Sequence, residues 1–145
     1  MKIDRITAED CRELSMLDIQ CFAVPWSEKS FLEETKNSLA TYYVAREDKI
    51  IGYCGFWKVL DEGQVTNIAV LPEYRNRGVA SALIEKMLEN CSDMKQIILE
   101  VRQSNDAAIK LYEKYGFKKA GVRKNFYRSP QEDGIVMIYE NLPNG

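Results

Sequence analysis

The segment YRNRGVASALIEKM, residues 74–87, places two arginines and a glycine directly before an apolar pattern of helical period. The first turn of a helix has backbone N–H groups without helical partners, and together with the helix dipole they bind anions. Gly78 has no Cβ to block a ligand, and Arg75 and Arg77 carry guanidinium groups that match phosphate oxygens. We therefore expect a phosphate site here, with a solvated basic turn as the alternative. The segment has neither the Lys-Ser/Thr of a P-loop nor the glycine spacing of a dinucleotide site.

The sequence contains no histidine, so any acid–base chemistry falls to carboxylates, tyrosine, lysine, cysteine or water. Glu100 is the first candidate. In the segment QIILEVR, strand alternation places Glu100 on the face opposite Ile97, Leu99 and Val101. A carboxylate in the middle of a strand is costly unless it is solvated, paired or used. Glu100 therefore either pairs with Arg102 or another base, or acts as a general base at the edge of a cleft.

Three further side chains have both a structural and a functional interpretation. Tyr112 is either a core tyrosine with a satisfied hydroxyl or a phenolic proton donor. Asn105, at the start of an amphipathic segment, is first of all an N-cap candidate. Trp26 is either a core anchor or part of a binding surface.

The elements that must position these residues follow from periodicity and turn signals. Thr7 and Ser27 are expected to cap the first two helices, and Gly116 to close the last one. Three strands joined by short turns predict an antiparallel meander, and the later strand–helix–strand order predicts a parallel crossover. The predicted strands are residues 2–6, 40–47, 49–59, 64–71, 96–102, 118–128 and 134–141, and the later helices are residues 78–90 and 105–115. We expect one α/β (α+β) domain, residues 1–145, with a mixed, mostly antiparallel sheet, a central parallel βαβ unit and helices on both faces.

Composition narrows the function classes. The chain has 145 residues and a net charge of −2 without a block of like charges, so we expect no direct binding to nucleic acid. No apolar run approaches the ~20 residues of a membrane helix, and the first residues do not resemble a signal peptide. The four cysteines form no C-x-x-C pair. We expect them to be reduced, in a cytoplasmic protein without a metal site.

Two long segments resemble the cofactor-binding segments of the GNAT family of N-acetyltransferases. In NIAVLPEYRNRGVASALIEKM, the family signature Arg/Gln-x-x-Gly-x-Gly/Ala is matched by Arg75, Gly78 and Ala80, and SNDAAIKLYEKYGFKKAGVRKNFY resembles the second segment. VPWSEKSF and LEVRQSN are similar to the ribosomal-protein-alanine N-acetyltransferase branch of this family. The resemblance covers almost the whole chain. It departs at Leu71-Pro72, where many relatives have a polar residue before the proline.

The resemblance implies acetyl-CoA as the bound phosphate compound, with Glu100 as general base and Tyr112 as general acid. On the acceptor side we expect Trp26, Asn67 and Tyr127. The cofactor-binding residues implied are Ile68, Ala69, Val70, Arg75, Asn76, Arg77, Gly78, Val79, Ala80, Ser81 and Asn105.

The activity implied is transfer of an acetyl group from acetyl-CoA to the N-terminal α-amine of a protein, in particular a small-subunit ribosomal protein, by direct attack in a ternary complex. Two alternatives stay open. One is an acetyltransferase for a polyamine or aminoglycoside, which needs an acidic pocket; its candidates are Glu28, Glu33, Glu34, Asp61 and Glu62. The other is a non-catalytic acetyl-CoA-binding module.

Overall fold

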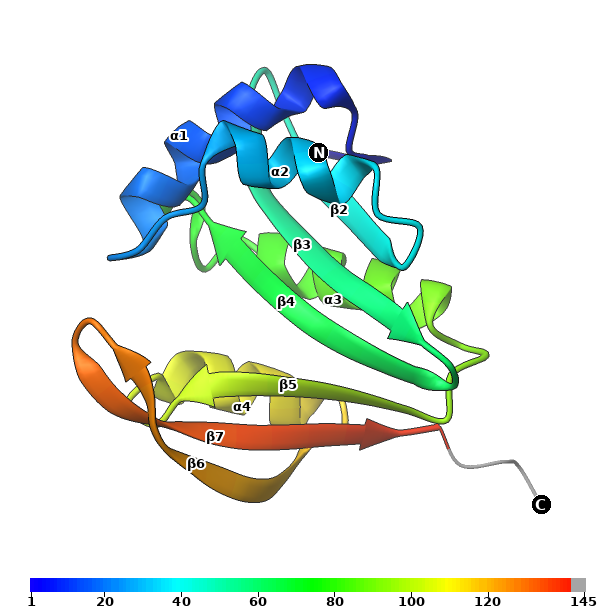
Figure 1. The fold of residues 1–145 in the computed structure, drawn as a ribbon, viewed down its shortest axis with the longest axis vertical. Coiled ribbons are helices and arrows are strands. Elements are labelled where there is room, and N and C mark those ends of the chain that lie inside the picture. The colour runs from blue at the N-terminus through cyan, green and yellow to red at the C-terminus, as the bar shows by residue number, and fades with distance from the viewer. Residues whose placement is uncertain (142–145) are drawn as a thin grey trace.

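Seven strands form one sheet in the order β1-β2-β3-β4-β5-β7-β6 in the computed structural model, which describes residues 1–141 (Figure 1). Neighbouring strands are antiparallel except for the central β4–β5 pair, which is parallel. The predicted mixed sheet is therefore confirmed, although β7 begins at Gln131 rather than at Gly134. The strands are β1 Lys2–Arg5, β2 Ala40–Arg46, β3 Ile50–Val59, β4 Glu62–Val70, β5 Gln96–Arg102, β6 Lys118–Arg128 and β7 Gln131–Glu140.

The helices begin and end where local sequence signals place them. They are α1 Cys11–Cys21, α2 Glu28–Thr35, α3 Val79–Asn90 and α4 Asp106–Lys114, with single 3₁₀ turns at Ala8–Asp10 and Pro72–Tyr74. Thr7 and Asp10 form a capping box. Ser27 and Asn105 each accept a hydrogen bond from the backbone N–H three residues later, at 3.1 and 3.2 Å. Gly116 has a φ of 104° and ends α4, as predicted.

Helices cover both faces of the sheet, and each face has its own apolar core (Figure 1). Leu14 of α1 and Phe31 of α2 pack on one face against Tyr42 and Tyr53. On the other face α3 and α4 contribute a second cluster, in which Leu83 is fully buried. The alternation predicted for β5 is confirmed, because its apolar residues 97, 99 and 101 are all buried there. No helix in residues 1–141 is long and apolar enough to span a membrane.

A β-bulge in β4 separates the two central strands. Gly55 of β3 pairs with Asn67, but the next residue of β3 pairs with Val65, so Thr66 is an extra residue in β4. The extra residue resets the side-chain alternation, and Thr66 and Asn67 both face the side covered by α1 and α2. Pairing between β4 and β5 extends only over Glu62–Gln64, and beyond it the strands diverge (Figure 1).

We predict that Gly55→Ala destabilises the protein by about 2–4 kcal/mol, because a Cβ at Gly55 would collide with the fully packed ring of Tyr42. Urea unfolding followed by circular dichroism measures the change. Gly121→Ala is the matched control, since a Cβ there has no atom within 4 Å. It should alter stability by less than about 0.5 kcal/mol. Equal effects of the two substitutions would contradict the packing argument.

Candidate active site

Two large cavities lie where β4 and β5 diverge. The loop-side cavity, about 720 Å³, is bounded by the loop before α3 and by α4. The hairpin-side cavity, about 600 Å³, is bounded by the segment between α1 and α2 and by the β6–β7 hairpin. The residues that line both are Cys21, Phe22, Ile68, Asn105 and Tyr112. A ligand in one cavity can therefore meet a ligand in the other beside Tyr112.

The loop-side cavity gathers nearly all the residues that the sequence predicted for the cofactor. Arg77 is the exception, because its guanidinium lies 5.3 Å from the ring centroid of Tyr74 and it does not line the cavity. Tyr74 does line it and was not predicted. The predicted residues present are Ile68, Ala69, Val70, Arg75, Asn76, Gly78, Val79, Ala80, Ser81 and Asn105.

The start of α3 has the properties of an anion cradle. Asn76 and Gly78 have φ angles of 63° and 81°, which bend the loop into the helix. The first turn of α3 contains no acidic residue, and its N–H groups lack helical partners. A Cβ at Gly78 would meet no atom of the protein, so glycine serves the backbone conformation and an open approach rather than internal packing. The Nε of Arg75 donates to the Val70 carbonyl at 3.0 Å and holds the loop against β4.

The diverging edge of β4 completes the loop-side cavity. Residues 68–70 pair with β3 on one edge, while within residues 1–141 no strand pairs with their other edge. Backbone N–H and C=O groups on an open edge can bind an extended ligand as an additional strand. This region therefore suits a linear chain that carries amide groups.

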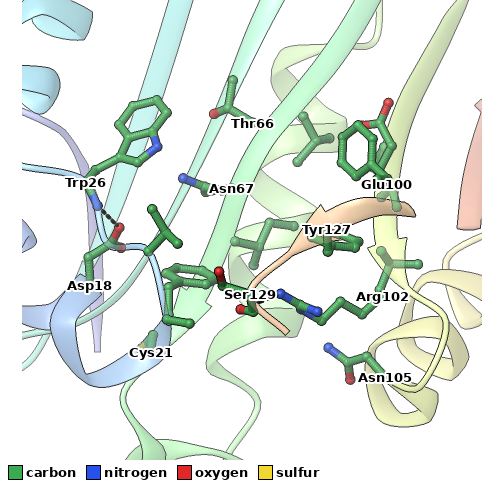
Figure 2. Close-up of a pocket in the computed structure, with 18 of the residues that line it drawn as sticks. Asp18, Cys21, Trp26, Thr66, Asn67, Glu100, Arg102, Asn105, Tyr127 and Ser129 are labelled. Atoms are coloured by element: carbon green, nitrogen blue, oxygen red, sulfur yellow. Dashed lines mark hydrogen bonds between the residues drawn. The ribbon is translucent and has the colours of Figure 1, made fainter. Parts of the chain in front are cut away.

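The hairpin-side cavity brings together the three predicted acceptor-side residues (Figure 2). Trp26 lies on one side, Asn67 on β4 forms part of the floor, and Tyr127 reaches across from the hairpin. Trp26 is also a core residue, since its ring centroid lies 5.5 Å from that of Phe31. Its backbone N–H donates to the buried Asp18 carboxylate at 2.9 Å, which attaches this wall of the cavity to α1.

Glu100 lies on β5 and lines the hairpin-side cavity but not the loop-side cavity. Its side chain is 23% exposed, and its Oε1 lies 3.6 Å from the Nε of Arg123 on the edge strand β6. Arg102, named above as a partner for Glu100, instead pairs with Glu132 at 3.2 Å. Glu100 thus has a basic neighbour and still faces open space, so pairing and chemical use are both compatible with its position.

Tyr112 lies at the junction of the two cavities and keeps its proton. Burial raises the pKa of Tyr112 well above its usual value, and the neighbouring Tyr127 and Cys54 raise it further. Its ring packs edge-on against Phe117, with centroids 5.7 Å apart. At neutral pH the phenol therefore carries its proton at the junction, and release of that proton needs a basic acceptor such as a departing thiolate.

Comparison with known proteins assigns the family. Residues 11–117 match the model of the Acetyltransferase (GNAT) family. The chain belongs to the GNAT family. Because GNAT acetyltransferases use acetyl-CoA, this chain is an acetyl-CoA-dependent N-acetyltransferase.

Named relatives in the GNAT family are similar over most of their length. A protein of Bacillus subtilis (strain 168), provisionally described as a [ribosomal protein bS18]-alanine N-acetyltransferase, is 39% identical over 133 residues, 89% of this chain and 88% of that protein. The [Ribosomal protein bS18]-alanine N-acetyltransferase of Escherichia coli (strain K12) is 35% identical over 125 residues, 83% of this chain and 84% of that enzyme. The crystal structure of the Escherichia coli ribosomal-protein-S18-alanine N-acetyltransferase superposes with a TM-score of 0.89 at 32% identity, covering 99% and 96% of the two chains.

Arg102 organises this GNAT site in a way that the sequence did not reveal. Its guanidinium donates to the carbonyls of Ser129 at 3.1 Å and Pro130 at 2.9 Å, and it lies 4.4 Å from the ring centroid of Tyr127. These contacts hold the hairpin over the cavity. In the sequence, Arg102 lies two residues after Glu100. The groups that bind Arg102 instead come from β7 and the hairpin, about 30 residues later in the chain, so the sequence could not reveal them.

We predict that the stability of this GNAT protein falls above about pH 10. Burial raises the pKa of Tyr42, Tyr53 and Tyr112 above the value near 10 that they have when unfolded. The contribution of these tyrosines to the free energy of unfolding is complete below that value. It is lost as pH rises through their folded-state pKa values. Urea midpoints between pH 8 and 11.5 measure the decline. Tyr112→Phe should reduce its slope by about 1 kcal/mol per pH unit; an unchanged slope would contradict the assignment.

Proposed function

We propose that this GNAT enzyme acetylates the N-terminal α-amine of a protein, in particular a ribosomal protein. The observation that carries the proposal is the meeting of the two cavities at Tyr112, with Glu100 on the hairpin side only. A cofactor in the loop-side cavity and an amine in the hairpin-side cavity would face each other at the residue best placed to donate a proton. This arrangement supports direct transfer in a ternary complex.

The residues of the loop-side cavity fit acetyl-CoA, which supplies the acetyl group as a thioester. The first turn of α3, with Asn76, Gly78 and Arg75, would hold the pyrophosphate. The open edge of β4 at residues 68–70 would pair with the pantetheine arm, and a backbone N–H near Val70 would polarise the acetyl carbonyl. Asn105 would contact the arm where the cavities meet. Arg77 lies outside the cavity, and its positive charge near the rim would attract the cofactor phosphates.

Glu100 and Tyr112 would divide the proton transfers. Glu100 would accept the proton of the substrate amine, directly or through water, and Tyr112 would donate its proton to the departing sulfur. An α-amine has a pKa of about 8, so roughly a tenth is neutral at pH 7; a lysine amine, at about 10.4, is neutral in well under a thousandth. A single carboxylate is therefore a more adequate base for an N-terminus than for a lysine side chain.

The hairpin-side cavity suits a peptide better than a polyamine. Trp26 and Tyr127 offer broad surfaces with a polar tip, of the kind that grip a peptide chain. None of the acidic residues considered for a polyamine site lines this cavity. Glu34 accepts hydrogen bonds from Tyr42 and Trp57, and Asp61 pairs with Lys95.

The named relatives support the same acceptor. Those relatives are described as acting on the alanine of ribosomal protein bS18, and at 35–39% identity they cover more than four fifths of this chain. The free state of all four cysteines is consistent with the proposed location, the cytoplasm. We expect the acceptor to be bound through its N-terminal peptide, without direct contact to nucleic acid.

We predict that the enzyme releases free thiol from acetyl-CoA with a short peptide that begins Ala-Arg, and not with the same peptide already N-acetylated. Glu100→Gln and Tyr112→Phe should each lower turnover at least tenfold, because each removes one proton transfer. A thiol-reactive dye measures the rate. Spermidine, assayed in parallel, should give no comparable turnover.

Three results would change this assignment or a residue role within it. Turnover with spermidine and not with the peptide would move it to small amines. Retained acetyl-CoA binding without any turnover would leave a cofactor-binding module. A peptide activity that survives Glu100→Gln would keep the reaction class and remove Glu100 as the base.

A further inference from the structure

Two buried tyrosines connect the floor of the hairpin-side cavity to the helices above it. The rings of Tyr42 and Tyr53 stack with centroids 6.3 Å apart and planes inclined by 17°. The Tyr42 hydroxyl donates to Glu34 of α2 at 2.8 Å, and the Tyr53 hydroxyl donates to Asp18 of α1 at 2.6 Å. The Tyr42 hydroxyl also contacts Thr66 of the β4 bulge. The direction of these hydrogen bonds determines what the bulge presents to a ligand.

The proton of Tyr42 is committed to Glu34. The indole N–H of Trp57, which can only donate, binds the same Oε1 of Glu34 at 2.8 Å, and Asn37 donates to the other oxygen. Glu34 is therefore an acceptor on both oxygens. Burial raises the pKa of Tyr42, so the phenol retains the one proton that it has to donate.

Thr66 must then donate to Tyr42. Its Oγ1 lies 2.9 Å from the Tyr42 hydroxyl oxygen, which has no second proton, so the Thr66 proton occupies that contact. Thr66 Oγ1 can then only accept from a ligand, through its lone pairs. Thr66 lines the hairpin-side cavity and a smaller adjoining cavity of about 360 Å³, and Glu100 lines both as well.

Asn67 adds an amide next to Thr66 in the bulge. It lines the hairpin-side cavity, and Figure 2 shows its nitrogen pointing toward the Asp18 side of the cavity. An amide has two N–H donors and one acceptor oxygen, so Asn67 can offer either kind of group to a ligand. The direction of its neighbour Thr66 is more restricted, because the hydroxyl has a single proton.

We propose that Thr66 Oγ1 and the Glu100 carboxylate form an acceptor pocket that recognises the substrate nitrogen by its N–H groups. Thr66 touches the substrate, and Tyr42 and Glu34 are positioning residues that set the direction of its hydroxyl. The inference rests on the proposed function and assigns Thr66 a role in it. A protonated α-amine has three N–H donors and no acceptor, so it can donate to both Thr66 and Glu100 at once.

The same pocket discriminates between substrate and product. An acetylated N-terminus has one N–H and no charge, so it leaves acceptors without partners, and unpaired buried groups are costly. A hydroxyl in place of the amine likewise offers one donor. The pocket therefore favours the free amine at binding and weakens the hold on the product after transfer.

Peptide binding to the enzyme saturated with coenzyme A, which cannot transfer an acetyl group, tests the pocket by calorimetry. Three versions of an Ala-Arg peptide differ only at the N-terminus: free amine, hydroxyl (lactyl in place of alanyl) and N-acetyl. The wild type should prefer the amine to the hydroxyl by at least tenfold. Thr66→Val, which keeps the shape and removes the acceptor, should reduce that preference at least fivefold.

Thr66→Ser is the matched control, because it keeps the hydroxyl; its preference should stay within twofold of wild type. Tyr42→Phe frees the Thr66 proton and should lower the preference as Thr66→Val does, while the affinity for coenzyme A stays within twofold in every variant. An unchanged preference in Thr66→Val overturns the inference and leaves the proposed function intact. A wild-type enzyme that binds none of the three peptides overturns the proposed function, and this inference with it.

Discussion

The separation of β4 from β5 is the constraint on which the rest of the site depends. Two strands in the middle of a sheet pair over only three residues and then diverge, because Thr66 is an extra residue in β4. Unpaired backbone groups inside a protein are costly unless a partner satisfies them. An unpaired strand edge in the middle of a sheet therefore costs stability on its own. A ligand with amide groups can pair with that edge and remove the cost.

The two cavities that result differ in the charged groups that line them. The loop side has the free N–H groups of α3, with Arg75 at the cavity wall and Arg77 near Tyr74, and no acidic residue in the first helical turn. The hairpin side has Glu100 and Thr66 near β4 and β5, and Arg102 and Arg128 at the hairpin. The loop side therefore favours an anion, whereas the hairpin side offers charges of both signs. An anion-binding loop side agrees with membership of the GNAT family, whose reaction transfers an acetyl group from acetyl-CoA to an amine and releases coenzyme A as a thiol.

Buried carboxylates fix the walls of the acceptor side. Asp18 accepts from Tyr53 and from the backbone of Trp26, and Glu34 accepts from Tyr42 and Trp57. Removing such groups from water costs about as much as their hydrogen bonds return, so their main contribution is a defined geometry rather than net stability. Arg102 has the corresponding role on the opposite wall, where it binds two carbonyls of the hairpin.

The sequence by itself determined the features that depend on residues a few positions apart. These features are decided within one turn of a helix or within one strand. They are the caps at Thr7, Ser27 and Asn105, the alternation of buried residues in β5 and the arginine–glycine loop. Hence the mixed sheet with its parallel β4–β5 pair and the anion-binding loop before α3 could be predicted, whereas the roles expected for Glu100 and Tyr112 came from the family resemblance.

Only the tertiary structure decided the features that join distant segments. A bulge is invisible in a regular apolar pattern, so Thr66 was not singled out. The partner of Glu100 is Arg123 rather than its neighbour Arg102, because β6 and β7 return beside β5 from later in the chain. The direction of the Thr66 hydroxyl depends on α2, β2 and β4 together. Hydrogen-bond donors can be counted only once the groups that share them are in contact.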